Sequence, residues 1–274
     1  MSNKLFLFAW VAAALAACSS EDTPVPATQP RLLTVEVSEN PLVDENGQAA
    51  PARRGAEITA STLTGFSMNY ESTKYDVSKS GSTWINNPDA WPVPDDSKIT
   101  FYAYNGGTFY SEGHYVSFTV DNTVSDQKDL LVATKSVAYN DASGKVWLTF
   151  DHACAAVNFN VQRTNTLGAD VTVTSIRLEG VKNQGEYNYT AWSDLSGSGS
   201  YELLNSTMTV TTTPTATSNG TLFLIPQTLD ASAKLVITYT KGTSKTAEIS
   251  LKDITWAKGT KYTINIKLGT TYIK

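Results

Sequence analysis

Alternating hydrophobic and polar residues recur along almost the whole chain and predict β-strands. Residues with β-branched or aromatic side chains occupy alternate positions in the segments 32–38, 97–105, 114–122, 145–152, 155–163, 171–180, 207–212, 220–227, 234–240, 246–253 and 261–268. Gly, Asn, Asp, Ser or Pro residues bound these segments, as at 105–107 and 195–200. Only the extreme N-terminus reads as continuously helical.

Closely spaced strands joined by turns favour antiparallel sheets, so the predicted fold class is all-β. The strands are too many for one small sandwich, and we expect two β-sandwiches in tandem. The polar, turn-forming stretch 137–146 separates them. The predicted domains are an N-terminal sandwich over 31–142 and a C-terminal sandwich over 143–274.

The first residues have the layout of a secretory signal. Lys4 precedes an apolar run over 5–17, which is too short for a membrane-spanning helix, and Cys18 follows the small residues Ala16 and Ala17. This arrangement looks like the lipobox of bacterial lipoproteins. We therefore predict a lipoprotein signal peptide over 1–17 and acylation of Cys18, by palmitate among other chains. An ordinary signal peptide with an incidental cysteine is the alternative.

An isolated strand pattern follows a polar, Pro-rich segment. Residues 18–30 read as a flexible tether. In the strand predicted over 31–38, Leu33, Val35 and Val37 share one face. The loop after it should be exposed and ends in Arg53-Arg54, which is either a protease site or a solvated basic pair. Arg31 is a second possible cleavage site, but a cut there would leave the strand attached.

Composition and candidate chemistry give little support to catalysis. The net charge is −5 without a basic block, so nucleic acid is not an expected partner. His152 and Cys154 fall short of the three or four ligands that zinc needs, and neither a metal nor a cofactor is expected. No serine lies in a nucleophile elbow. The acidic residues that could pair for glycoside hydrolysis do not stand out from one another; they are Glu71, Asp76, Asp95, Asp96 and Asp129.

Two tryptophans flank a polar loop. Trp84 and Trp91 enclose "INNPDA", where aromatic rings either stack on a sugar or cap a hydrophobic core. Trp147, Trp192 and Trp256 fall on or near predicted strands and are expected in the core.

Several segments, in their order along the chain, resemble the fimbrillin-like proteins of Bacteroidetes, which include the Mfa-like and FimA-like subunits of type V pili. The segments that carry the resemblance are "RRGAEITASTLTGFSMNY" at 53–70, "ITFYAYN" at 99–105, "DQKDLLVA" at 126–133, "VWLTFDHACAAVNFNV" at 146–161, "LFLIPQTL" at 222–229 and "ITWAKGTKYTINIKL" at 254–268. Cys154 departs from this pattern, because the family more often has an aliphatic residue there. The resemblance implies that His152 is a structural residue.

The resemblance also implies a function. It implies two transthyretin-like sandwiches and a lipoprotein precursor in the outer membrane. An arginine-specific protease would cut at Arg53 or Arg54 and release the first strand. A strand of another fimbrial subunit would then occupy the groove left by Leu33, Val35 and Val37. The expected role is a structural, tip or accessory subunit of a cell-surface fimbrium that contributes to adhesion to a host or bacterial surface.

The C-terminal strand has two interpretations. Tyr262, Ile264, Ile266 and Leu268 alternate, and they form either a donor strand for another subunit or the last strand of the C-terminal sandwich. Two functional alternatives also stay open. One is a surface lipoprotein that binds glycans through Trp84 and Trp91, and the other is an uncleaved fimbrial anchor. An enzyme is not expected.

Overall fold

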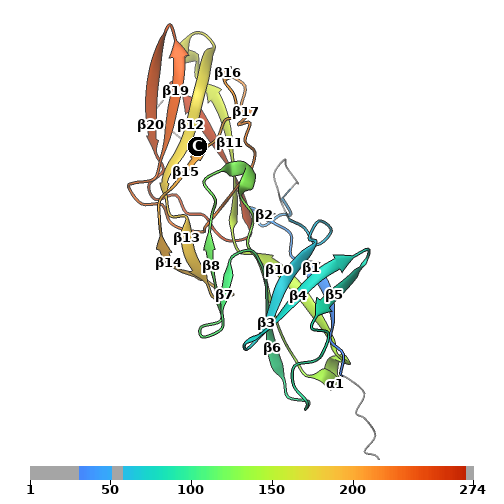
Figure 1. The fold of residues 1–274 in the computed structure, drawn as a ribbon. Helices are drawn as coiled ribbons and strands as arrows, with labels where there is room; N and C mark the ends of the chain where they lie inside the picture. Colours follow the sequence, from blue (N-terminus) through green and yellow to red (C-terminus); the bar gives the residue numbers. More distant parts are fainter. Residues whose placement is uncertain (1–30, 51–57, 270–274) are drawn as a thin grey trace, which may run out of the picture. The chain divides into compact units, whose positions relative to one another are not determined.

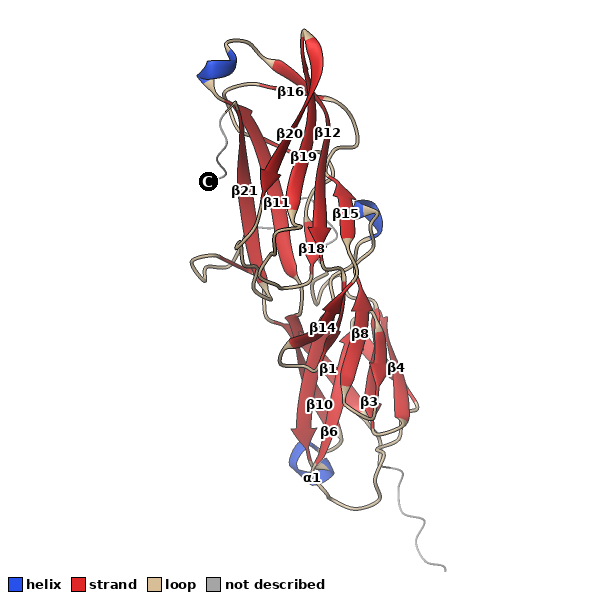
Figure 2. Cartoon of the chain, turned by 90° about the vertical axis from the view of Figure 1, so that its left-hand side faces the viewer, coloured by secondary structure: helices blue, strands red, loops and turns tan. Residues whose placement is uncertain are grey.

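Strands make up most of the computed structural model, which describes residues 31–50 and 58–269 (Figures 1 and 2). Within these residues, helical structure is limited to α1 (Tyr139–Ala142), η1 (Val124–Asp126) and η2 (Asn165–Leu167). No helix among them has the length and hydropathy needed to cross a membrane. The predicted all-β fold class is confirmed.

The first sheet contains the N-terminal strand. Among the described strands its order is β1-β10-β9-β6-β3-β4-β5. Their bounds are β1 (Thr34–Glu39), β3 (Gly65–Tyr70), β4 (Thr73–Ser80), β5 (Thr83–Asn87), β6 (Ile99–Asn105), β9 (Leu131–Val137) and β10 (Lys145–His152). β1 lies at one edge of this sheet and β5 at the other.

Three further sheets are formed mainly by later residues. One has the order β17-β11-β21-β2, with β18 also paired to β11; these are β2 (Val43–Asp44), β11 (Ala155–Arg163), β17 (Thr215–Ala216), β18 (Leu222–Leu224) and β21 (Thr260–Leu268). Another has the order β15-β12-β19-β20, with β16 on β12; these are β12 (Val171–Val181), β15 (Gly199–Glu202), β16 (Met208–Val210), β19 (Lys234–Lys241) and β20 (Thr243–Ser250). The last has the order β14-β13-β8-β7; these are β7 (Thr108–Tyr110), β8 (Tyr115–Thr119), β13 (Gln184–Tyr187) and β14 (Trp192–Ser196).

Parallel pairing corrects the expectation of wholly antiparallel sheets. β1 runs parallel to β10, and β21 runs parallel to both β11 and β2. Parallel neighbours need a long crossover, and a local strand pattern does not reveal one. The remaining pairs recorded between the described strands are antiparallel, as predicted.

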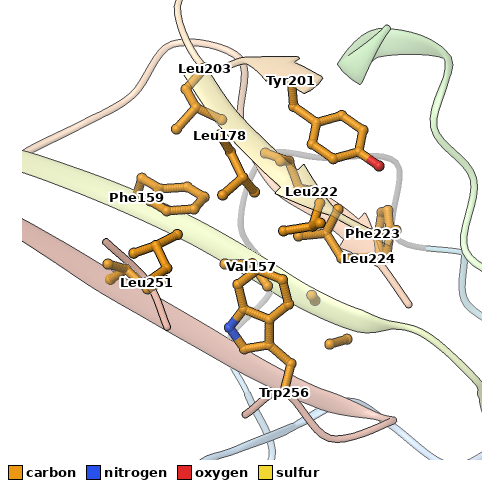
Figure 3. Close-up of a cluster of buried hydrophobic side chains, with 14 of the residues drawn as sticks. Val157, Phe159, Leu178, Tyr201, Leu203, Leu222, Phe223, Leu224, Leu251 and Trp256 are labelled. Atoms are coloured by element: carbon orange, nitrogen blue, oxygen red, sulfur yellow. The ribbon is translucent and has the colours of Figure 1, made fainter. Parts of the chain in front are cut away.

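Two hydrophobic clusters result from the alternation along the strands. The cluster beneath the first sheet, which we call the N-terminal core, consists of Leu33, Val35, Leu63, Phe66, Met68, Tyr75, Val77, Trp91, Ile99, Phe101, Ala103, Leu131, Ala133, Val137, Val146, Leu148 and Phe150. The larger cluster, the C-terminal core, includes Val157, Phe159, Leu178 and Trp256, which Figure 3 shows converging from β11, β12 and the segment between β20 and β21. Trp256 is in the core, as predicted.

Strand β10 follows the predicted domain division at 142/143 but pairs with β1 and β9. Its inward residues Val146, Leu148 and Phe150 belong to the N-terminal core, whereas Ala153 and Cys154 belong to the C-terminal core. The division into two sandwiches stays a prediction. These contacts place the boundary between the two hydrophobic clusters after His152 and not at 142/143. The alternation that buries Val146 and Leu148 also turns Trp147 outward, where it is 59% exposed, so the prediction of a core position for Trp147 was wrong.

Candidate functional site

Strand β1 provides apolar side chains to the N-terminal core from the edge of a sheet. It pairs with β10 in a register from Thr34 opposite Lys145 to Glu39 opposite Phe150. Leu33 and Val35 are 2% and 4% exposed, and Val37 packs partly buried against the same cluster. As predicted, these three side chains therefore lie on the same face of the strand. Burying side chains of this size stabilises a fold by about 1.5–3 kcal/mol each.

The start of β1 also contacts the far end of the sheet. The Leu33 amide donates to the Asp89 carbonyl (2.7 Å), and the Trp91 amide donates to the Arg31 carbonyl (2.7 Å). Leu32 and Ala90 form an isolated antiparallel bridge between these bonds. The segment 89–91 follows β5, so residues 31–33 connect the two edges of the sheet. Figure 2 shows β1 alongside β10.

Both ends of β1 are fixed by backbone bonds to the β10 side. The Thr34 amide donates to the Gly144 carbonyl (2.9 Å), and the Asn40 amide donates to the Phe150 carbonyl (2.8 Å). Gly144 has φ +77°, and a Cβ there would overlap the Leu32 carbonyl oxygen. Only glycine combines this backbone conformation with so close an approach of the incoming strand.

Arg31 holds the beginning of the strand with its side chain. Its Nη1 donates to the carbonyl oxygens of Pro94 (2.7 Å) and Asp95 (2.6 Å), and its Nη2 lies 3.5 Å from Asp96 Oδ1. Its Cζ lies 4.0 Å from the centroid of the Tyr139 ring, which is a cation–π geometry. Hydrogen bonds from Ser97 lower the pKa of Asp95, and the charge of Arg31 contributes further.

The chain after β1 reaches the second core. Leu42 is buried in the C-terminal core, and the Ala50 amide donates to its carbonyl (2.9 Å). β2 pairs in parallel with the first residues of β21, and the Val43 amide donates to the Gly259 carbonyl (3.0 Å). The segment 31–50 therefore supplies buried side chains to both hydrophobic clusters.

Three predicted site residues lie outside the described part of the chain. They are Cys18, the predicted lipidation site, and Arg53 and Arg54, the predicted cleavage site. Their roles stay predictions.

The candidate donor residues belong to a strand that its own sheet uses. β21 pairs with β11 from Lys261 to Leu268, and Ile264, Ile266 and Leu268 are buried in the C-terminal core. Tyr262 is partly buried, and its hydroxyl accepts a hydrogen bond from the Ala257 amide (2.9 Å). Of the two interpretations, the strand of the C-terminal sheet agrees with these contacts.

The two candidate ligand tryptophans differ in burial. Trp91 is 5% exposed and packs edge-on against Phe101 and Tyr139, at centroid distances of 5.4 Å each. Its ring faces are therefore not available for stacking on a sugar, which corrects the prediction for this residue. Trp84 is half-buried beside Phe66, with Lys79 over its ring, and its role as a ligand aromatic stays a prediction.

His152 and Cys154 form a buried polar cluster with Asp129. His152 Nδ1 lies 2.5 Å from Asp129 Oδ2, and all three residues are nearly inaccessible to solvent. Burial raises the pKa of Asp129, while hydrogen bonds from His152 and Cys154 oppose that shift. Burial, together with the Asp129 charge, also raises the pKa of the Cys154 thiol, which disfavours the reactive thiolate. Within the described residues no group of three or more His, Cys, Asp or Glu is arranged to hold a metal ion.

Comparisons with known proteins agree with this architecture. Solved structures with similar folds include a fimbrial protein from Bacteroides vulgatus, at 20% identity and a TM-score of 0.57, with 89% of this chain and 97% of that chain covered. A protein from Parabacteroides distasonis assigned to cell adhesion matches at 11% identity and a TM-score of 0.54, with 88% and 90% covered. At these identities the likeness shows a shared fold.

Sequence comparison provides the family. A search of curated proteins found no match. A family model described as fimbrillin-like matches residues 52–274, which is most of the chain. This chain therefore belongs to the fimbrillin-like family.

Proposed function

We propose that this protein is a structural or accessory subunit of a cell-surface fimbrium, at its tip or along it, and that it assembles by exchange of strand β1. It is made as a lipoprotein that Cys18 anchors in the outer membrane. An arginine-specific protease cuts at Arg53 or Arg54 and releases the segment before the cut. A strand of another subunit then takes the place of β1, and the assembled fimbrium contributes to adhesion.

One observation carries this proposal. β1 is an edge strand, yet Val35 and the preceding Leu33 are buried in the N-terminal core, at 4% and 2% exposed. Its departure would expose apolar surface and the unpaired edge of β10 together, and a sheet edge beside an apolar groove is a ready site for another strand. The described part of the segment that would leave, 31–50, connects to the rest of the chain through the stretch that contains Arg53 and Arg54.

The fold is compatible with such an exchange because β1 is not joined to its neighbour β10 by a short loop. β1 and β10 are more than one hundred residues apart in the sequence, so a cut between them leaves only non-covalent contacts. An incoming strand that keeps the register of β1 would run parallel to β10.

Limited digestion of the full chain with an arginine-specific protease tests the proposal. We expect a cut after Arg53 or Arg54, loss of the N-terminal segment, and SDS-resistant oligomers on gel electrophoresis. The matched control, Arg53→Ala/Arg54→Ala, should stay intact and monomeric under the same conditions. Resistance of the native chain to cleavage, without oligomers, would contradict the proposal and leave an uncleaved anchor as the better description.

A further inference from the structure

We infer that the groove vacated by β1 contains a guanidinium pocket that selects an incoming strand carrying an arginine two residues before its first buried apolar side chain. This inference rests on the proposed strand exchange and adds the chemistry of the partner strand. In the intact chain the pocket is filled by Arg31, which lies two residues before Leu33.

All groups that form the pocket come from the part of the chain after the cleavage site. They are the carbonyl oxygens of Pro94 and Asp95, the carboxylate of Asp96 and the ring of Tyr139, at 2.7, 2.6, 3.5 and 4.0 Å from Arg31. When residues 31–53 leave, the pocket therefore stays on the remaining part of the protein, which we call the body. Its oxygen acceptors then no longer have a cation bound to them.

The pocket is held in place by contacts that do not involve Arg31. The Asn140 amide donates to Asp96 Oδ1 (2.7 Å), and the Ser97 amide donates to Asp95 Oδ1 (2.9 Å). Tyr139 packs on Trp91, which packs on Phe101 of the core. A preformed site of this kind needs little reorganisation when a new cation enters.

Arginine fits these groups better than lysine does. The site offers two carbonyl oxygens, a carboxylate and an aromatic ring. A guanidinium has several donors in one plane for the oxygens and a flat face for the ring. A lysine ammonium would contact fewer of these acceptors at once.

The pocket also fixes the register of the incoming strand. Residues 31, 33 and 35 share one face of the strand, so an arginine in the pocket places the apolar side chains that follow in the Leu33 and Val35 positions. A slip by one residue would turn those side chains out of the core. Strand β21 lacks this pattern, because Thr260 precedes Tyr262 by two residues and Tyr262 precedes Ile264 by two. The pocket therefore does not favour β21 of a second copy as the incoming strand.

The inference is tested by measuring how a peptide binds to the protein from which cleavage at Arg53 or Arg54 has released the N-terminal segment. The probe is a fluorescent peptide with the sequence of residues 29–40, and anisotropy gives its Kd. We expect the Arg31→Ala peptide to bind about 10- to 100-fold more weakly, the range for a charge-assisted contact, the Arg31→Glu peptide more weakly still, and the Arg31→Lys peptide between native and Ala. The Glu36→Ala peptide loses only a surface contact with Lys145, so its Kd should stay within about two-fold of the native value.

The same effect should follow from changing the pocket. In the cleaved Tyr139→Leu variant, the native and Arg31→Ala peptides should differ less in Kd than they do in the native body. Equal binding of these two peptides to the native body would overturn the inference while the proposed strand exchange stands. If the native peptide does not bind at all, both are overturned.

Discussion

Replacing Leu33 by aspartate is expected to detach β1 from its sheet. The carboxylate would enter a position that is 2% exposed, among the apolar side chains of the N-terminal core. Loss of the leucine contacts and burial of an unpaired charge together cost about 3–5 kcal/mol. Because β1 is at the sheet edge, the chain can avoid this cost by releasing the strand without unfolding the remaining sheets.

Amide hydrogen exchange measures that release directly. The amides of Thr34 and Asn40 donate to carbonyls on the β10 side, so their protection reports whether β1 is seated. In Leu33→Asp their exchange should accelerate by about 100- to 1,000-fold, while protection in β11 and β12 persists.

Thr34→Asp is the matched control for this substitution. Thr34 is the next residue along the strand, is exposed, and lies opposite Lys145 in the register. The same charge on this face should change stability by less than about 0.5 kcal/mol. If both variants lost protection equally, burial of Leu33 would not be what holds β1.

Replacing Asp129 by alanine should have the second large effect. The substitution leaves His152 buried without its carboxylate partner, and breaking a buried pair in this way costs about 3–5 kcal/mol. The pair lies where the backbone leaves the N-terminal core and enters the C-terminal one, so both clusters should lose stability together. Chemical denaturation would show this as a single transition shifted to lower denaturant concentration.

A double-mutant cycle separates the pair from the effects of each residue. Asp129→Ala/His152→Ala should be little less stable than Asp129→Ala alone, because the first change has already broken the Asp129–His152 contact. Asp126→Ala, at a nearby exposed position, is the control and should stay within about 0.5 kcal/mol of the native protein. Fully additive losses for the double variant would contradict a direct interaction.

Local patterning predicted β1, β6, β8, β10, β11, β12, β19, β20 and β21 and the faces that they bury, but it did not predict β3, β4, β5 and β9 of the first sheet. In 145–152 the alternation places Val146, Leu148 and Phe150 in the core, and it also indicates that Trp147 points outward. Treating Trp147 as a core residue ignored that alternation. The parallel pairing of β1 with β10 was not predictable, because the register between segments so distant in the chain depends on the whole sheet.

Only the part of the candidate site that depends on local alternation was predictable from the sequence. Leu33, Val35 and Val37 follow from a period of two residues, which the sequence displays. The Arg31 pocket consists largely of backbone carbonyl oxygens, which every residue has, so no side-chain pattern marks it. Asp129 and His152 were both visible as polar residues in strand-rich segments, but their contact depends on the alignment of β9 with β10.

A disulfide between β1 and β10 tests whether β1 must leave its sheet before the protein assembles. Ser38 lies opposite Thr149, with their hydroxyl oxygens 3.0 Å apart, and neighbouring strands are separated by about 5 Å, which suits a disulfide. The Ser38→Cys/Thr149→Cys variant of the full chain is cut with the arginine-specific protease, and assembly is followed by SDS-resistant oligomers. Each single-cysteine variant serves as a control and should behave as the native chain does.

We expect the oxidised double variant to be cut but to retain residues 31–53 and not to assemble. Reduction should then release the segment and restore oligomers to the level of the native chain. Equal assembly of the oxidised and reduced forms would contradict the claim that β1 must leave for another strand to bind.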